Sequence, residues 1–154
     1  KIPFDMLYGP AYKGIPLVTS IVIAFASLGR NVPFAFNRKE KKDHGEGGVI
    51  IGTPLKGRVL IVDDVISAGT SVNESVNLIL EEGAKPSGIA ISIDREEKGT
   101  GLLSAVEEIK ETHHLPICHL TSLKEIMRYI EHHETYASHM GAMRDYQKVY
   151  GIKA

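Results

Sequence analysis

The chain of 154 residues is poor in cysteine, in net charge and in long apolar runs. Its single cysteine, Cys118, excludes an internal disulfide and a cysteine-based zinc cluster, and it agrees with a reducing cytoplasm. Eighteen Lys and Arg against nineteen Asp and Glu give a net charge of −1, which excludes a general basic field for nucleic acid. The longest apolar stretch, residues 17–28, is too short to span a membrane.

The composition is that of an ordinary globular domain, with 43% hydrophobic and 24% charged residues. These values exclude a disordered chain, a collagen and a coiled coil. The length predicts one domain over residues 1–154. Because the chain begins at Lys1 and shows no secretory pattern, we expect its start to be an interior point of a longer protein.

Short apolar runs alternate with helical patterns, which predicts an α/β domain with a mostly parallel sheet flanked by helices. The apolar run Val59–Val62 is typical of a central strand covered on both faces. The expected strands are residues 4–8, 32–37, 49–52, 58–65, 87–94 and 116–120; the expected helices are 13–28, 70–82, 102–112, 122–132 and, whole or as a pair, 135–150.

The helical period also predicts which side chains are buried. Ser122 and Glu125 have the spacing of a capping box, and Cys118 is expected to be a small buried hydrophobe. The expected inward faces are Leu17, Ile21, Ala24 and Leu28 in the first helix, Val72, Val76, Ile79 and Leu80 in the second, and Val106 and Ile109 in the third.

Residues 38–48, RKEKKDHGEGG, contain no apolar side chain and predict a mobile loop. The simplest interpretation of such a segment is a solvated run of charge. Lys39, Lys42 and His44 are also donors that a closing loop would bring to a departing anion.

Ligands of parallel sheets bind beyond the carboxyl ends of the strands, and three polar segments lie there: residues 9–14, 63–71 and 94–95. In the second, Asp63 and Asp64 end an apolar strand, and the small residues of Ser67–Ser71 lead into a helix, as in a phosphate cradle. The absence of a Walker lysine excludes that kind of ATPase. The acid pair suits sugar hydroxyls or hydrated Mg²⁺; the simpler alternative is a helix cap beside solvated acids.

The other two segments are weaker signals. Gly9 to Gly14, with Lys13, is either an anion-binding loop or an ordinary turn. Arg95 offers a planar fork that matches a carboxylate, and the alternative is a surface pair with Glu96 or Glu97. The three histidines near the end of the third helix are interpreted as solvated rather than as metal ligands: His113, His114 and His119.

The segment VLIVDDVISAGTS, residues 59–71, resembles the phosphoribosyl-pyrophosphate signature of type I phosphoribosyltransferases. From Phe4 to about Tyr150 the chain is similar to the bacterial orotate phosphoribosyltransferases. The further matching segments are YGPAYKG at 8–14, FNRKEKKDHGEGG at 36–48 and IDR at 93–95.

The resemblance implies that the chain transfers the phosphoribosyl group of phosphoribosyl pyrophosphate to orotate, giving orotidine monophosphate and pyrophosphate in pyrimidine (UMP) synthesis. It implies Mg²⁺ as cofactor, a cytoplasmic homodimer with shared active sites, and a cis peptide before Tyr12. Family members carry an N-terminal hood, with a lysine and two aromatic residues over orotate, that we expect to be absent here. The alternatives are a regulatory protein that binds phosphoribosyl pyrophosphate, an inactive fragment of the same fold, or an enzyme for another base.

The resemblance also implies a role for each matching residue. Lys39, Lys42, His44 and Asp64 are implied to be catalytic, with the loop cations reaching a neighbouring subunit, and Ser67 and Arg95 to bind orotate, while no residue binds the metal directly. The residues implied to bind phosphoribosyl pyrophosphate are Tyr12, Lys13, Arg38, Lys39, Lys42, His44, Asp63, Asp64, Val65, Ile66, Ser67, Ala68, Gly69, Thr70 and Ser71.

Overall fold

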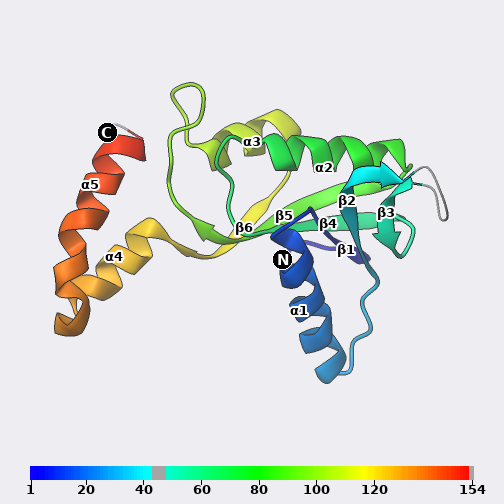
Figure 1. Cartoon of the computed structure of the whole chain (residues 1–154), viewed down its shortest axis with the longest axis horizontal. Helices are drawn as coiled ribbons and strands as arrows, with labels where there is room; N and C mark the ends of the chain where they lie inside the picture. Colours follow the sequence, from blue (N-terminus) through cyan, green and yellow to red (C-terminus); the bar gives the residue numbers. More distant parts are fainter. Residues whose placement is uncertain (43–47, 153–154) are drawn as a thin grey trace. The chain divides into compact units, whose positions relative to one another are not determined.

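The computed structural model describes residues 1–42 and 48–152, and of residues 40–42 it describes the backbone alone. Six strands form one sheet in the order β3-β2-β1-β4-β5-β6 (Figure 1). Strand β1 pairs in parallel with β2 and β4, whereas β3 runs antiparallel to β2. The predicted α/β fold with a mostly parallel sheet is confirmed. The strands are β1 Met6–Gly9, β2 Phe34–Lys42, β3 Gly48–Gly52, β4 Arg58–Asp63, β5 Lys85–Asp94 and β6 Ile117–Ser122.

The helices follow the predicted order, and the last one is a short 3-10 helix followed by an α-helix. They are α1 Gly14–Ser27, α2 Thr70–Glu81, α3 Ala105–His113, α4 Leu123–Glu131, η1 Glu134–His139 and α5 Met140–Tyr150. In the parts of the chain that the structure describes, no helix has both the length and the apolar character needed to cross a membrane.

The chain divides into two compact units. The first contains residues 1–64 and 70–90, and the second contains residues 65–69 and the chain from Ile91 onward. Strand β5 begins in the first unit and ends in the second.

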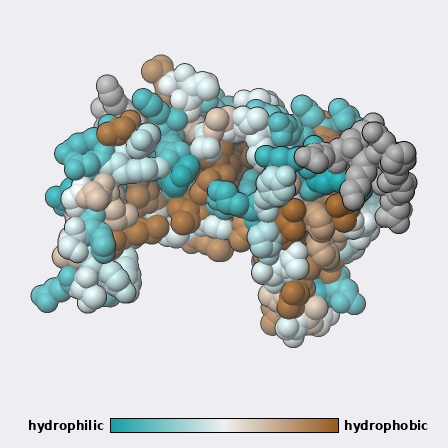
Figure 2. Space-filling model, viewed as in Figure 1, coloured by the Kyte–Doolittle hydropathy of each residue, from teal (hydrophilic) through white to brown (hydrophobic). Residues whose placement is uncertain are grey.

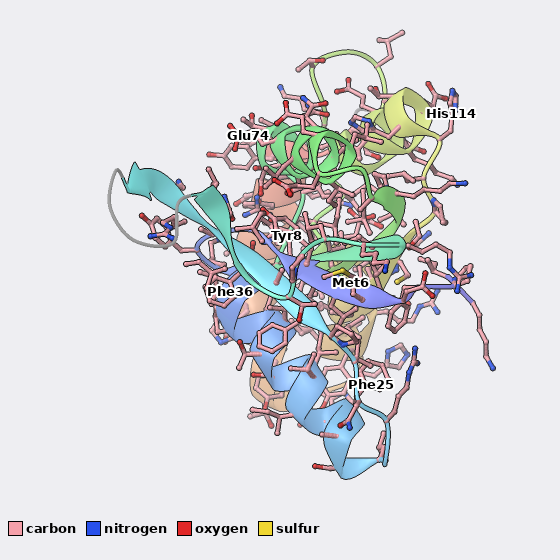
Figure 3. All side chains as sticks on the ribbon, turned by 90° about the vertical axis from the view of Figure 1, so that its right-hand side faces the viewer. Met6, Tyr8, Phe25, Phe36, Glu74 and His114 are labelled. Atoms are coloured by element: carbon pink, nitrogen blue, oxygen red, sulfur yellow. The ribbon has the colours of Figure 1, made fainter. Side chains whose placement is uncertain are left out.

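In the first unit, α1 and α2 cover opposite faces of the sheet, and Figure 3 shows Phe25 on one side of β1 and Glu74 on the other. Because successive strand residues point to opposite faces, Leu7 packs in the cluster under α1 while Tyr8 is hydrogen bonded to Ser75 of α2. Both side chains are almost completely buried. The central strands are therefore covered on both faces, as the apolar run in β4 predicted.

The predicted inward face of α1 is partly wrong. Val18 is fully buried, and Val22 and Phe25 pack beside it against the sheet, whereas Ala24 is exposed and Leu28 is 81% exposed. The sequence of α1 is apolar nearly all round, so the helical period did not select one face. Figure 2 shows apolar side chains along this helix.

Two other burial predictions are also wrong. Leu80 of α2 is 56% exposed, because the buried stripe follows Val72, Val76 and Ile79, and Leu80 lies one position beyond it. Cys118 is exposed, because β6 is an edge strand whose middle residues face solvent. In α3, Ile109 is buried as predicted and Val106 is half-buried.

The predicted loop at residues 38–48 is shorter than expected. Strand β2 continues through Lys42, and β3 begins at Gly48. The strands pair Asn37 with Ile50 and, after a shift of register, Lys42 with Gly48. Backbone hydrogen bonds across an antiparallel pair hold a polar strand without apolar side chains. Residues 43–47, which include His44, lie outside the described residues.

Two capping boxes set the helix starts of the second unit. The Ser122 hydroxyl accepts from the Glu125 backbone N–H at 3.2 Å, and the Glu125 carboxylate accepts from the Ser122 N–H at 2.7 Å, so this prediction is confirmed. Ser104 and Glu107 form the same arrangement at the start of α3. Helices α4 and α5 contact each other and η1.

Candidate active site

The loop between β1 and α1 packs closely against β2 and the first turn of α1. The Ala11–Tyr12 peptide is cis, as the resemblance implied, and the Ala11 N–H donates to Asn37 Oδ1 at 2.7 Å. A Cβ added at Gly9 would lie 2.3 Å from the carbonyl oxygen of Gly14, so no other residue fits there without a shift. The loop is therefore held against the middle of β2, at Asn37.

The acid pair lies at the carboxyl end of β4. Asp63 is buried and accepts two hydrogen bonds, from the Asp64 N–H at 2.9 Å and from the Ser71 hydroxyl at 3.1 Å. Burial raises the pKa of Asp63, the neighbouring Asp64 charge adds to the rise, and the two hydrogen bonds oppose it. A cation or a sugar hydroxyl bound here would stabilise the ionised form of Asp63.

Two cations of the predicted site each contact another predicted site residue of the same chain, a pairing that the sequence did not predict. The Lys13 Nζ forms an ion pair with Asp64 Oδ2, which joins the β1–α1 loop to the end of β4. The Lys39 Nζ lies 5.1 Å from the centre of the Tyr12 ring, a cation–π contact between β2 and the same loop. The first unit thus gathers residues that lie more than fifty positions apart in the sequence.

A chain of hydrogen bonds connects β1, the start of α2 and the end of β4. The hydroxyls of Tyr8 and Ser75 share a hydrogen bond, and the Ser75 hydroxyl donates to the Ser71 carbonyl at 2.6 Å. Ser71 in turn donates to Asp63. The start of α2 is therefore tied both to β1 and to the end of β4. Burial raises the pKa of Tyr8, so its phenol stays neutral and able to hydrogen bond.

A cavity of about 710 Å³ opens beside these residues in the first unit. Four of the residues predicted to bind phosphoribosyl pyrophosphate line it: Arg38, Lys39, Thr70 and Ser71. The other lining residues come from β1 and its loop, from β2 and β3, and from α2: Tyr8, Pro10, Ala11, Asn37, Val49, Glu74, Ser75, Asn77, Leu78 and Glu81.

The remaining predicted residues belong to the second unit, or their side chains lie outside the described part of the chain. Residues 65–69 fall in the second unit, where Ile66 is buried, Ser67 and Ala68 are exposed, and Gly69 has a φ of 73°.

Arg95 also lies in the second unit, and its Nη2 donates to Glu97 at 3.0 Å, the pairing weighed above as the alternative. For Lys42 the structure gives the backbone, in β2. The roles assigned to all these residues stay predictions.

Sequence reasoning missed two contacts in the first unit and one in the second. Asn37 holds the β1–α1 loop and Ser75 joins Tyr8 to α2, and both contacts depend on the register of distant segments. Tyr146 donates to Glu97, beside Arg95. Asn37 gave one signal, since it ends the apolar part of β2 within the matching segment FNRKEKKDHGEGG.

The acid pair offers carboxylate oxygens of the kind that a hydrated divalent cation binds. Across the described residues, no three His, Cys, Asp or Glu side chains gather into a metal-binding group. Asp63 and Asp64 offer the oxygen ligands that Mg²⁺ prefers, and Mg²⁺ usually takes one or two carboxylates together with water and substrate oxygens.

Comparison with known proteins places the chain in a family. A model of the phosphoribosyl transferase domain matches residues 2–111. The orotate phosphoribosyltransferase of Chromobacterium violaceum is 56% identical over 151 residues, which cover 98% of this chain and 71% of that protein. The chain belongs to the orotate phosphoribosyltransferases. The Thiobacillus denitrificans protein of that name is 54% identical over the same shares of the two chains.

Solved structures of orotate phosphoribosyltransferases have the same fold. The enzyme of Francisella tularensis matches with a TM-score of 0.78 at 35% identity, over 97% of this chain and 69% of that one. The Mycobacterium tuberculosis enzyme, solved in complex with phosphoribosyl pyrophosphate, matches with a TM-score of 0.65 at 24% identity, over 80% of this chain and 65% of that one, which is a likeness of fold.

Proposed function

We propose that this chain transfers the 5-phosphoribosyl group of phosphoribosyl pyrophosphate to orotate, releasing pyrophosphate and forming orotidine monophosphate. The observation that carries the proposal is the cluster at the end of β4, where Asp63 contacts Ser71 and Asp64 contacts Lys13. It combines acids for a sugar, a helix start for a phosphate and a cation for a leaving anion. The high identity to the named relatives supports the same reaction.

In the proposed reaction, the bond between the anomeric carbon and the pyrophosphate oxygen breaks, and the electron pair leaves with pyrophosphate. A ring nitrogen of orotate bonds to that carbon, and the proton of this nitrogen is released to water. Asp63 and Asp64 bind the ribose hydroxyls, and Thr70 and Ser71 bind the 5-phosphate at the start of α2. Lys13 binds the departing pyrophosphate. Catalysis then comes from positioning and from charge stabilisation, because no residue needs to act as a nucleophile.

The ion pair of Lys13 with Asp64 has a place in this proposal. It keeps the lysine at the β1–α1 loop and offsets the charge of an acid that is partly buried. When the substrate binds, its pyrophosphate oxygens compete for the ammonium while its hydroxyls take over the carboxylate. Both groups are therefore held near the positions that the substrate requires.

Magnesium, the dimer and the cytoplasmic location belong to the proposal as well. Mg²⁺ would be held through water by Asp63 or Asp64 and by the substrate, and when bound it neutralises pyrophosphate charge. A homodimer would let Lys39, Lys42 and His44 act on a neighbouring site. The single cysteine agrees with a cytoplasmic location.

The test is the loss of orotate absorbance in the presence of this chain, phosphoribosyl pyrophosphate and Mg²⁺. We expect turnover, and a fall in kcat of about a hundredfold for Lys13→Ala, because a donor aimed at developing charge is removed. Lys110→Ala, an exposed lysine of α3, is the matched control and should behave as the wild type. Binding of phosphoribosyl pyrophosphate without turnover of orotate or any other base would favour a regulatory protein or an inactive fragment instead.

A further inference from the structure

The side chains of Arg95, Glu97 and Tyr146 form a chain of contacts within the second unit. Arg95 follows β5, and its Nη2 donates to Glu97 Oε2 at 3.0 Å. The other carboxylate oxygen of Glu97, Oε1, accepts a hydrogen bond from the Tyr146 hydroxyl of α5. Each oxygen of the carboxylate therefore has its own donor, one from the end of β5 and one from α5.

The backbone of Glu97 is fixed on two sides. Its carbonyl accepts from the Ala105 N–H at 3.0 Å, at the start of α3, and the residue forms an isolated β-bridge with Gly151 after α5. The next residue, Lys98, donates its N–H to the Tyr150 carbonyl at 2.8 Å. The backbone of Glu97 is therefore held in place on two sides.

The turn that carries Glu97 back toward Arg95 is also defined. Asp94 Oδ1 accepts from the Glu96 N–H at 2.9 Å, and Glu96 adopts a φ of 54°, a left-handed conformation that is uncommon for a residue other than glycine. In an extended strand the side chains of residues 95 and 97 would lie on the same face, but their separation would not be fixed. This turn fixes it.

Arg95 keeps donors that Glu97 does not use. Its Nε is buried and has no hydrogen-bond partner among the described residues. A buried donor without a partner is costly, whereas a carboxylate ligand would bind the exposed nitrogens at the end of the guanidinium. The side chain of Arg95 is 37% exposed and that of Glu97 is 15% exposed, so the arginine is open to a ligand while its anchor is mostly covered.

We propose that Glu97, held by Tyr146, is a positioning residue that orients Arg95 toward the carboxylate of orotate. Helix α5 thereby contributes to selection of the base although it supplies no atom to the substrate. The inference rests on the proposed function, because it presumes that Arg95 recognises orotate. An exposed ion pair on its own would contribute little, but here the carboxylate is mostly buried and bound on both oxygens.

The test separates the two substrates by steady-state kinetics. In Tyr146→Phe the ring remains beside Tyr150 and only the hydroxyl is lost. We expect KM for orotate to rise about threefold to tenfold, the usual effect of one hydrogen bond, while KM for phosphoribosyl pyrophosphate stays within about twofold. Tyr150→Phe, which removes a hydroxyl from the half-exposed neighbour on the same helix, is the matched control and should leave both constants unchanged.

A double-mutant cycle shows whether Glu97 acts through Arg95. Glu97→Gln should raise KM for orotate in the wild-type background and should add nothing in the Arg95→Ala background. Equal changes in the two KM values, or additive effects of Glu97→Gln and Arg95→Ala, would overturn the inference and leave the proposed function intact. A wild-type chain that binds phosphoribosyl pyrophosphate but neither binds nor consumes orotate would overturn the proposed function itself, and this inference with it.

Discussion

The pairing of Asp5 with Arg58 shows how a single exposed residue can be tied into the fold. Asp5 accepts from the Arg58 backbone N–H at 2.8 Å and from two guanidinium nitrogens, at 3.0 and 2.7 Å. These bonds hold the first residues of the chain beside the start of β4. They lower the pKa of Asp5 from 3.8 to about 2, through the side-chain bonds first and the backbone bond second.

This pairing predicts an acid dependence of stability. Because the pKa of Asp5 is lower in the folded chain, its contribution is complete above pH 3.8 and is lost as the pH falls toward about 2. We expect the urea midpoints of wild type and Asp5→Asn to differ by a constant amount from pH 7 to about pH 4 and to converge below it. A difference that stays constant down to pH 2.5 would contradict the assignment.

Among the residues of the site, those predictable from sequence are the ones whose chemistry is local. Asp63 and Asp64 stand out because two acids end an apolar strand, and Arg95 because it follows another. The partners of these residues were not predictable in the same way. In the first unit Asn37 contacts the β1–α1 loop through strand register, and in the second unit Tyr146 contacts Glu97 through helix packing. No local pattern records either contact.

At the scale of elements, the β1–α1 loop depends on the absence of side chains at its two ends. A Cβ at Gly9 would lie 2.7 Å from Val18 Cγ1 as well as 2.3 Å from the Gly14 carbonyl oxygen. Neither neighbour can move away, since Val18 is fully buried and the carbonyl belongs to the first turn of α1. The glycine therefore sets how closely β1 and α1 approach.

We predict that Gly9→Ala destabilises the fold by about 1–3 kcal/mol, the range for overpacking a core, and that it lowers the affinity for pyrophosphate. Chemical denaturation and pyrophosphate titration measure the two effects. Gly141→Ala is the matched control, because nothing lies within 4 Å of its added Cβ and the residue is in α5. That variant should be neutral or slightly more stable.

The capping box of α4 gives a second prediction for an element. Ser122 is buried, and its hydroxyl accepts from the Glu125 N–H, so Ser122→Ala leaves that N–H in the first turn of α4 without its capping partner. We expect a loss of about 1 kcal/mol in thermal or chemical unfolding. Ser27→Ala, which removes an exposed hydroxyl from the end of α1, should change stability by less than about 0.5 kcal/mol.

The order and kind of the elements were predictable, whereas several of their faces and ends were not. The apolar run of β4 and the capping box of α4 are local signals, and both are confirmed. Strand β2 extends through Lys42 because its backbone pairs with β3, a contact between segments that composition does not reveal. Leu28 and Leu80 are exposed because packing, rather than the helical period alone, chose the buried face.

At the scale of the whole molecule, the proposed dimer predicts which pairs of variants can complement each other. Lys42 is proposed to act on a neighbouring site, whereas Lys13 and Asp64 contact each other within one chain. In the proposed dimer, the two kinds of residue would belong to different halves of a shared site. Variants of these residues should complement one another only when they come from different halves.

We predict that mixing Lys42→Ala with Asp64→Asn chains restores about a quarter of wild-type activity, because half of the dimers are mixed and each has one intact site. Activity after unfolding and refolding the mixture measures this recovery. The control mixes Lys13→Ala with Asp64→Asn, which damage the same half and should give no recovery. Recovery in the control, or none in the first mixture, would argue against sites shared in this way.

The burial of Tyr8 also gives the chain an intrinsic absorbance signal for the opening of its core. The sequence has six tyrosines and no tryptophan, and Tyr12, Tyr129, Tyr136 and Tyr150 are exposed. Burial raises the pKa of Tyr8, so after a jump to strongly alkaline solution its phenolate forms only when the surrounding core opens. A late phase in the absorbance trace, absent in Tyr8→Phe, would therefore time the opening of the strand that leads into the β1–α1 loop, without any attached label.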